Sequence, residues 1–339
     1  MRVLITGSTG FVGSHCLESL SKIPQIDVIP ACRDKNRLPP EFQATARVGD
    51  LLDPAYQDSL LDGIDVVIHA AAWTSLWGNK KRSDRYFLRP SLELVNKSKR
   101  QGIKRFIFIS TLASSAPDCS HDPMSHGIDR PYWPHLSNVI KIEEALRSNS
   151  DDNFTAINLR LGLFVGSRYA LGILPTLLPR LKTHLVPWVA KGKTSLALID
   201  GKDIGQCASL AVTTQGLKGY ESFNVVGPDV PTVREVIEYL HEKHNFPLPH
   251  FNVSFPVAFI FAGFMELINP LVPWEPLVTR SIIHLLRETN ANNDRAETIL
   301  GYTPKHHWKK SIDNQVNEMS IRQSKPMRLA VPLHRGKGK

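Results

Sequence analysis

The sequence predicts an α/β fold built on a doubly wound parallel sheet, with a smaller C-terminal lobe that binds substrate. Short apolar segments alternate with amphipathic helical patterns through the first half of the chain, and a glycine-rich turn follows the first of these segments. From about residue 166 the sequence pattern is different, because prolines interrupt apolar turns. Strands that are apolar throughout are buried on both faces, which is typical of a parallel sheet.

Five segments have this apolar character, and we expect each to be a strand: residues 3–6, 26–31, 66–70, 106–110 and 154–159. Helical spacing of apolar residues lies between them, as at Cys16 and Leu20 and again at Leu88, Leu92 and Val95. Alternation of strand and helix predicts right-handed βαβ units.

The first strand runs directly into TGSTGFVG, and we expect a helix to begin at Val12. Glycines at this junction allow a tight turn, close approach of the backbone to a pyrophosphate and close packing of helix on strand. The helix N-terminus adds free N–H groups and the positive end of its dipole. The pattern predicts a dinucleotide site lined by Gly7, Thr9, Gly10, Phe11, Val12 and Gly13.

Composition is that of a globular protein, with 42% hydrophobic and 22% charged residues. Lys and Arg number 41 against 32 Asp and Glu, but no single block of the chain holds this excess, so we expect no nucleic-acid partner. Four scattered cysteines argue against a zinc site and a disulfide framework, and for the cytoplasm. We see no signal peptide, and the longest uncharged run, 251–265, is too short to span a membrane. It reads as a buried or an interfacial helix, which leaves peripheral membrane contact open.

We divide the chain into a dinucleotide-binding domain, residues 1–165 with a returning segment at about 195–228, and a substrate lobe, residues 166–194 and 229–320. Residues 321–339 form a basic tail that we expect to be disordered. Such a lobe would cap the carboxyl ends of the strands, where ligands bind in open α/β sheets.

The order of motifs resembles the extended (or atypical) short-chain dehydrogenase/reductase family, in its NAD-dependent epimerase/dehydratase and 3β-hydroxysteroid dehydrogenase-like branch. The segments that carry the resemblance are TGSTGFVG, GDLLDP, HAAA, FIFIST, NLRLGLFVG, LIDGKDIGQCASLAV, FNVVGPDVPTVREVIEYL and LGYTPK. It extends to about residue 320 and implies a Rossmann fold. Leu161 replaces the proline of the family's Arg-Pro-Gly segment, and Phe87 to Ser91 replace a stretch that usually carries Asn and a Gly-Thr pair.

The resemblance also implies cofactor contacts. Asp50 and Leu51 would lie against the adenine, and the strand end at Ala70, Ala71 and Ala72 would lie beside the nicotinamide ribose. At the end of the second strand, ACRDKNR places Arg33 where it would accept a 2′-phosphate. Arg33 favours NADP(H), whereas the following Asp34 keeps NAD(H) open.

For catalysis the family uses a Tyr four residues before a Lys on one helix face. Here Lys141 matches the lysine, which grips the ribose, but Ser137 stands in the place of the tyrosine. A serine hydroxyl is too weak an acid to replace a phenol directly. Thr111, with Ser110, matches the strand end that binds the reacting oxygen.

Several groups are candidates for the missing proton donor. His135 titrates near neutrality, although a structural role is an alternative. Tyr132 would either fold back over the nicotinamide or pack as an aromatic lid. Tyr169 would either contact the substrate or have a core or rim role. Ser137 would relay through water. Trp73 and Trp77 would either line the substrate cleft or have a packing role alone.

Two main interpretations follow. The first is an NAD(P)(H)-dependent oxidoreductase that acts on a hydroxyl or carbonyl group of an apolar small molecule through a non-standard proton donor. The second is a dinucleotide-binding sensor or scaffold that lost the chemistry. An isomerase, epimerase or lyase is a third interpretation, and a homodimer stays open.

Overall fold

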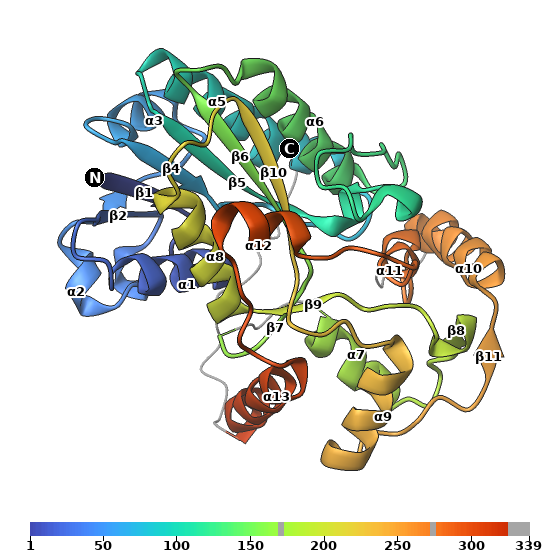
Figure 1. Cartoon of the computed structure of the whole chain (residues 1–339). Helices are drawn as coiled ribbons and strands as arrows, with labels where there is room; N and C mark the ends of the chain where they lie inside the picture. The colour runs from blue at the N-terminus through green and yellow to red at the C-terminus, as the bar shows by residue number, and fades with distance from the viewer. Residues whose placement is uncertain (169–172, 272–275, 325–339) are drawn as a thin grey trace.

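The computed structural model describes residues 1–168, 173–271 and 276–324. Its centre is a seven-stranded parallel sheet in the order β10-β6-β5-β4-β1-β2-β3 (Figure 1). The strand order turns back on either side of β1, so helices cover both faces and the predicted doubly wound Rossmann-type sheet is confirmed.

The five strands expected from the sequence are present within one or two residues. The seven strands of the sheet are β1 (Arg2–Thr6), β2 (Asp27–Cys32), β3 (Arg47–Val48), β4 (Val66–His69), β5 (Arg105–Thr111), β6 (Thr155–Leu161) and β10 (Tyr220–Val225). Strand β10 pairs with β6 although about 60 residues separate them, which brings a later part of the chain back to the sheet.

Side chains of β1 alternate between two cores because successive strand residues point to opposite faces. Val3 and Ile5 pack under α1 (Phe11–Leu20), α8 (Gly201–Thr213) and α12 (Asp294–Leu300). Leu4 packs under α3 (Pro54–Leu60), α5 (Arg89–Arg100) and α6 (Pro134–Asn149). The sheet is thus buried on both faces, as its apolar strands predict.

A smaller region beside the sheet has its own apolar core, around Leu174, Trp188 and Trp308. It contains two short strand pairs, β7 (Leu163–Val165) with β9 (Leu198–Asp200) and β8 (Trp188–Val189) with β11 (Asn252–Val253), of which β7 and β9 fall within the residues that the sequence assigns to the dinucleotide-binding domain. Its helices are α7 (Ile173–Leu181), α9 (Val233–His244), α10 (Phe255–Ile268), α11 (Arg280–His284) and α13 (Trp308–Ser324). Helices α10 and α11 lie together at the right edge of Figure 1, beyond the carboxyl end of β5.

Shorter elements complete the chain. They are α2 (Pro40–Gln43), α4 (Lys80–Ser83) and a π-helical turn, Asp84–Leu88, that leads into α5. Across residues 1–168, 173–271 and 276–324, no helix has both the length and the apolar composition needed to cross a bilayer.

Candidate active site at the carboxyl edge of the sheet

Backbone contacts fix the shape of the glycine loop. Gly7 has φ +67°, and a Cβ there would lie 2.7 Å from the backbone of Ala71. A Cβ at Gly13 would lie 2.3 Å from the Gly7 carbonyl oxygen. These distances are shorter than any carbon contact allows, so both positions require glycine.

Gly10 differs from the other two because its surroundings are open. It is exposed, it caps α1 at Phe11, and a Cβ there would meet only the Gly7 carbonyl oxygen at 3.2 Å. Thr9 is half-buried beside it and Val12 is buried. The Phe11 ring stacks on Phe164 at 5.6 Å and holds the first turn of the helix. The first N–H groups of a helix have no partner within the helix itself, and such an N-terminus is a suitable site for a pyrophosphate.

A buried histidine joins the loop to the next strand. His69, at the end of β4, contacts the Thr6 hydroxyl at 2.8 Å and the Ser91 hydroxyl at 2.9 Å. Thr6 in turn accepts a hydrogen bond from the Ala71 N–H at 3.3 Å. Burial lowers the pKa of His69 to about 4, so the imidazole is neutral and holds the strand end in place. Ala70 and Ala71 are half-buried beside the glycine loop, and Ala72 is exposed.

The ends of β2 and β3 carry the polar residues expected near the adenosine. Asp34 accepts a hydrogen bond from the Asn36 N–H at 3.0 Å and caps a short 3₁₀ turn. Arg33 is exposed and has no ion pair with any residue that the structure describes. Asp50 is exposed and accepts from the Leu52 N–H at 3.0 Å, while Leu51 is half-buried. The Arg33 guanidinium and the second carboxylate oxygen of Asp34 are therefore both accessible to a ligand.

A small cleft with a volume of about 60 Å³ opens at the carboxyl ends of β5 and β6. Thr111 lies in its wall together with Ala113, Leu161, Leu163 and residues 284, 285 and 287–289. The Thr111 hydroxyl oxygen accepts the Ala113 N–H at 3.3 Å. Its O–H is therefore available to a ligand in the cleft.

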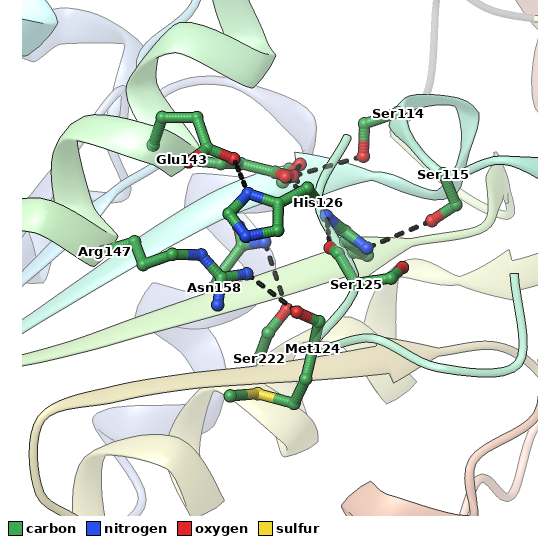
Figure 2. A network of polar contacts seen from close by, with 12 residues as sticks. Ser114, Ser115, Met124, Ser125, His126, Glu143, Arg147, Asn158 and Ser222 are labelled. Atoms are coloured by element: carbon green, nitrogen blue, oxygen red, sulfur yellow. Dashed lines mark hydrogen bonds and ion pairs between the residues drawn. The ribbon is translucent and has the colours of Figure 1, made fainter. Parts of the chain in front are cut away.

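Ser110 points away from this cleft into a buried polar cluster. Its hydroxyl donates to Glu143 of α6, which also accepts from Ser114 at 3.2 Å. Arg160 of β6 is fully buried and binds Glu143 through Nη2 at 2.6 Å and through Nε at 3.3 Å. Figure 2 shows Ser114 and Ser115 facing this cluster. Serine side chains form further hydrogen bonds with both the carboxylate and the guanidinium of this ion pair. The ion pair fixes α6 against the ends of β5 and β6.

Helix α6 carries Ser137 and Lys141, the two residues that the sequence predicts to correspond to the family's catalytic pair. The buried Ser137 hydroxyl donates to Asp129, on the segment before the helix. Lys141 is exposed one turn later and has no ion pair within the part of the chain that the structure describes. Its charge and a hydrogen bond from Lys80 lower the pKa of Asp84, the bond from Lys80 contributing more. Lys141 is free to bind a ligand, whereas Ser137 already has an acceptor.

His135 packs against Phe87, in the 87–91 stretch where the sequence departs from the family's pattern, with ring centroids 4.9 Å apart. Burial lowers the pKa of His135 to about 4, and its Nδ1 has no hydrogen-bond partner among the described residues. Trp73 packs against the core under α3, α5 and α6, and Trp77 is half-buried. Tyr169 lies outside the described residues.

The structure adds one residue that sequence reasoning did not find. His284 of α11 lies in the cleft wall with Thr111. Its Nε2 lies 3.1 Å from the Ala113 carbonyl oxygen and its Nδ1 lies 2.9 Å from the Tyr132 hydroxyl. Since Nε2 must donate to the carbonyl, Nδ1 accepts from Tyr132. Burial lowers the pKa of His284 to about 4, in keeping with a neutral ring.

Comparison with known proteins agrees with this geometry. The model of the NAD dependent epimerase/dehydratase family matches residues 3–226, which include the glycine loop, Thr111 and Lys141. The chain belongs to this family. The extended short-chain dehydrogenase/reductase resemblance is therefore confirmed at the level of the family.

Two relatives match nearly the whole chain. The sterol-4-alpha-carboxylate 3-dehydrogenase, decarboxylating, of Dictyostelium discoideum is 23% identical over 92% of this chain and 98% of its own length. A 4-hydroxy-2-methyl-3-oxo-4-farnesyl-3,4-dihydroquinoline-1-oxide ketoreductase of Stigmatella aurantiaca is 22% identical over 99% of this chain and 100% of its own.

Solved structures share the fold. The UDP-glucose 4-epimerase of Thermotoga maritima covers 96% of this chain with its whole length, at a TM-score of 0.72 and 20% identity. The UDP-glucuronic acid 4-epimerase of Bacillus cereus, solved in complex with NAD, covers 95% of this chain with 99% of its own, at a TM-score of 0.69 and 18% identity.

Proposed function

We propose that the protein is an NAD(P)(H)-dependent oxidoreductase that acts on a hydroxyl or carbonyl group of an apolar small molecule. The observation that carries this proposal is the position of the Thr111 cleft. It opens at the same edge of the sheet as the glycine loop, and the strands β1, β4 and β5 that carry the two sites are neighbours. A substrate oxygen at Thr111 would therefore lie beside the nicotinamide end of a dinucleotide held at the loop.

The names of the relatives, more than the cleft, support an apolar substrate. The lining of the cleft is mixed: seven of its sixteen residues are leucine, alanine or proline, and eight are polar, including Thr111, Arg287 and Glu288. The two relatives that match nearly the full chain are named for a sterol carboxylate and for a farnesylated quinoline, both largely apolar molecules. A substrate of this kind, with a rigid ring system and one polar end, fits these observations.

For the cofactor we favour NADP(H), because Arg33 is exposed and has no ion pair among the described residues. NAD(H) is the alternative, supported by structural relatives solved with NAD. Calorimetric titration with both cofactors separates them: Arg33→Ala should weaken NADP(H) binding and leave NAD(H) binding nearly unchanged. Equal affinity of the wild type for both cofactors would contradict the preference.

Cofactor residues follow from the same placement. The glycine loop would hold the pyrophosphate, Asp50 and Leu51 the adenine, and residues 70–72 with Lys141 the nicotinamide ribose. When bound, the nicotinamide supplies or takes up the hydride. The chain's own task is to hold the substrate oxygen and move one proton.

We propose that His284 and Tyr132 move this proton in place of the absent family tyrosine. Nε2 of the neutral His284 donates to the Ala113 carbonyl in the cleft wall, and Nδ1 accepts from Tyr132. A substrate oxygen bound by Thr111 in the same cleft would compete with the Ala113 carbonyl for the Nε2 proton. Of the other candidates, Ser137 and Ser110 already donate to carboxylates, and His135 lies against Phe87.

The proton balance of the reduction is complete. The substrate alkoxide takes the proton from Nε2 as Nδ1 takes the hydroxyl proton of Tyr132, so the imidazole stays neutral and a phenolate remains. Burial raises the pKa of Tyr132, but the positive charges of Arg130, Arg287 and Arg280 lower it and would stabilise the phenolate. Solvent then returns the proton, and oxidation runs the same steps in reverse.

The direct test is turnover. Purified protein is mixed with NADPH or NADH and a panel of steroid, terpenoid and aromatic ketones, and consumption of the reduced cofactor is followed by absorbance. Reduction of an apolar ketone supports the proposal. The second candidate, a dinucleotide-binding sensor or scaffold, is favoured by Ser137 in place of tyrosine. It predicts tight cofactor binding with no turnover of any substrate in either direction, and this outcome would overturn the oxidoreductase proposal.

A further inference from the structure

The outer surface of helix α10 is apolar, and none of the described elements covers it. Five large apolar side chains of the helix are between 53% and 75% exposed, namely Val257, Ile260, Phe261, Phe264 and Leu267, and Leu271 in the following 3₁₀ turn is 85% exposed. The opposite side of the helix packs through Ala258 and Ala262 onto Ile283 of α11 and Val189 of β8. Exposed apolar patches of this size on a soluble domain mark a binding surface.

This outer surface carries no charge. Within residues 251–271 the only charged side chain is Glu266. Its carboxylate turns inward, where it is 10% exposed and binds the Arg280 guanidinium at 2.7 Å. Arg287 lies at the start of the helix, with its guanidinium 5.3 Å from the Phe255 ring, and has no acidic partner among the described residues. An uncharged apolar face beside an unpaired cation matches the interface of an anionic bilayer, where acyl chains lie under phosphates.

We propose that the outer surface of α10 docks the protein onto an anionic membrane surface. The net charge of +9 attracts the chain to anionic lipid and repels a second copy of itself. The helix of 14 residues is about 21 Å long, so one face of it is small for the roughly 800 Å² per partner of a stable dimer. The same length prevents it from crossing a bilayer, so it would lie in the interface plane.

Membrane docking through α10 would place the cleft near the bilayer. Helix α10 packs on α11, and α11 carries His284 in the wall of the cleft. In Figure 1 both helices lie at the edge of the molecule opposite β2 and β3. An apolar ligand dissolved in the bilayer would reach the cleft from this side without crossing water. This step depends on the proposed function, whereas the docking itself follows from the surface alone.

The test is flotation of the full chain with vesicles of phosphatidylcholine and phosphatidylserine. The double substitution Ile260→Asp with Phe264→Asp should lower the bound fraction at least ~10-fold, because two apolar side chains leave the lipid. Val230→Asp is the matched control, since Val230 is 38% exposed outside α10, and it should float like the wild type. Cofactor binding and thermal unfolding of each variant report that the fold is intact.

A gentler variant guards against misfolding. Phe264→Trp keeps the surface apolar, and its fluorescence should shift to shorter wavelength and be quenched by brominated lipid when vesicles are added. Three results would overturn the proposal: wild-type protein that stays with the soluble fraction, equal flotation of the double variant, or a wild-type dimer that the double variant converts to monomers without any vesicle binding.

The salt dependence separates the helix from the basic C-terminal tail. Binding through the tail alone would vanish at about 0.5 M salt, where screening extends only a few Å, and would be the same in the double variant. Binding through α10 persists at that salt concentration. Turnover is not needed for any of these measurements, so failure of the docking proposal and failure of the oxidoreductase proposal are independent results.

Discussion

The two ends of the carboxyl edge of the sheet are built in different ways. At the β1–β4 end the backbone shapes the site: Gly7 and Gly13 lie so close to other main-chain atoms that no side chain fits. At the β5–β6 end side chains shape it, because Glu143 and Arg160 lock α6 and His284 enters from α11. The first end keeps the motifs of its family, and the second departs from them.

This difference shows which part of an active site tolerates replacement. A pyrophosphate cradle made of main-chain N–H groups has few alternatives, because a Cβ in the wrong place removes it. A proton donor is a side chain, and any acid that reaches the same oxygen from another element can serve. Loss of tyrosine at position 137 therefore need not end the chemistry if Tyr132 and His284 supply the proton.

The largest effect should come from the backbone-built end. Gly10→Val places a branched side chain where the pyrophosphate approaches. The new Cβ would lie 3.2 Å from the Gly7 carbonyl oxygen, a tight contact that a shift of a few tenths of an ångström relieves. We expect cofactor affinity to fall by at least ~100-fold, about 2.7 kcal/mol, with little change in the thermal unfolding temperature. Titration calorimetry measures it. The cofactor affinity of Gly10→Ala should lie between those of the wild type and the valine variant. If the valine variant binds the cofactor normally, the glycine loop has only a structural role.

The next effect should come from the side-chain-built end. Tyr132→Phe and His284→Gln should each lower kcat by about 10²-fold, typical of a lost acid–base group, without changing cofactor affinity. Because both act in one proton route, the double variant should be little slower than either single one. Tyr239→Phe is the control, since that hydroxyl binds Asp313 far along the chain. Additive losses in the double variant would exclude a shared route.

The sequence predicts the first end much better than the second. Apolar strands and a glycine turn are local patterns, and they locate β1, β2, β4, β5 and β6 within two residues. Contacts between distant residues leave no such pattern: Tyr132 and His284 are 152 residues apart, and the segment around His284 reads as an ordinary apolar helix. Ser110 also looks like a ligand-binding strand end, and only its buried partner Glu143 shows that its hydroxyl is engaged. The uncharged run at 251–265 is compatible with either burial or exposure, since both need apolar residues.

Low pH should destabilise the folded protein through His69, which lies beside the glycine loop. Folding lowers the pKa of this buried imidazole from 6.5 to about 4, so the unfolded chain binds a proton that the folded chain does not. Stability is therefore complete above about pH 6.5 and falls as the pH drops towards 4, by up to about 3 kcal/mol for this group. Urea unfolding at several pH values measures this effect. The free energy of unfolding should fall less steeply with decreasing pH for His69→Gln than for the wild type.

The smallest effect lies where the two ends meet, on helix α6. If Lys141 binds the ribose, Lys141→Ala should weaken cofactor binding by about 1.5 kcal/mol, the lower end of the range for a charged hydrogen bond, because Lys141 is exposed to solvent. Ser137→Ala should leave binding nearly unchanged, because its hydroxyl donates to Asp129 and not to a ligand.

Ser137→Tyr sharpens this comparison further, because it restores the family's pair one helical turn from Lys141. A phenol at this position should raise the turnover of ketones in a Tyr132→Phe background, where the proposed route is broken, and change it less in the wild type. Cofactor affinity and NADPH consumption of each variant provide the measurements. If Lys141→Ala binds the cofactor as tightly as the wild type, the match of α6 to the family's catalytic helix is wrong. Lys141 is then a solvated surface residue, and the departure from the family extends to the ribose-binding side of the helix as well.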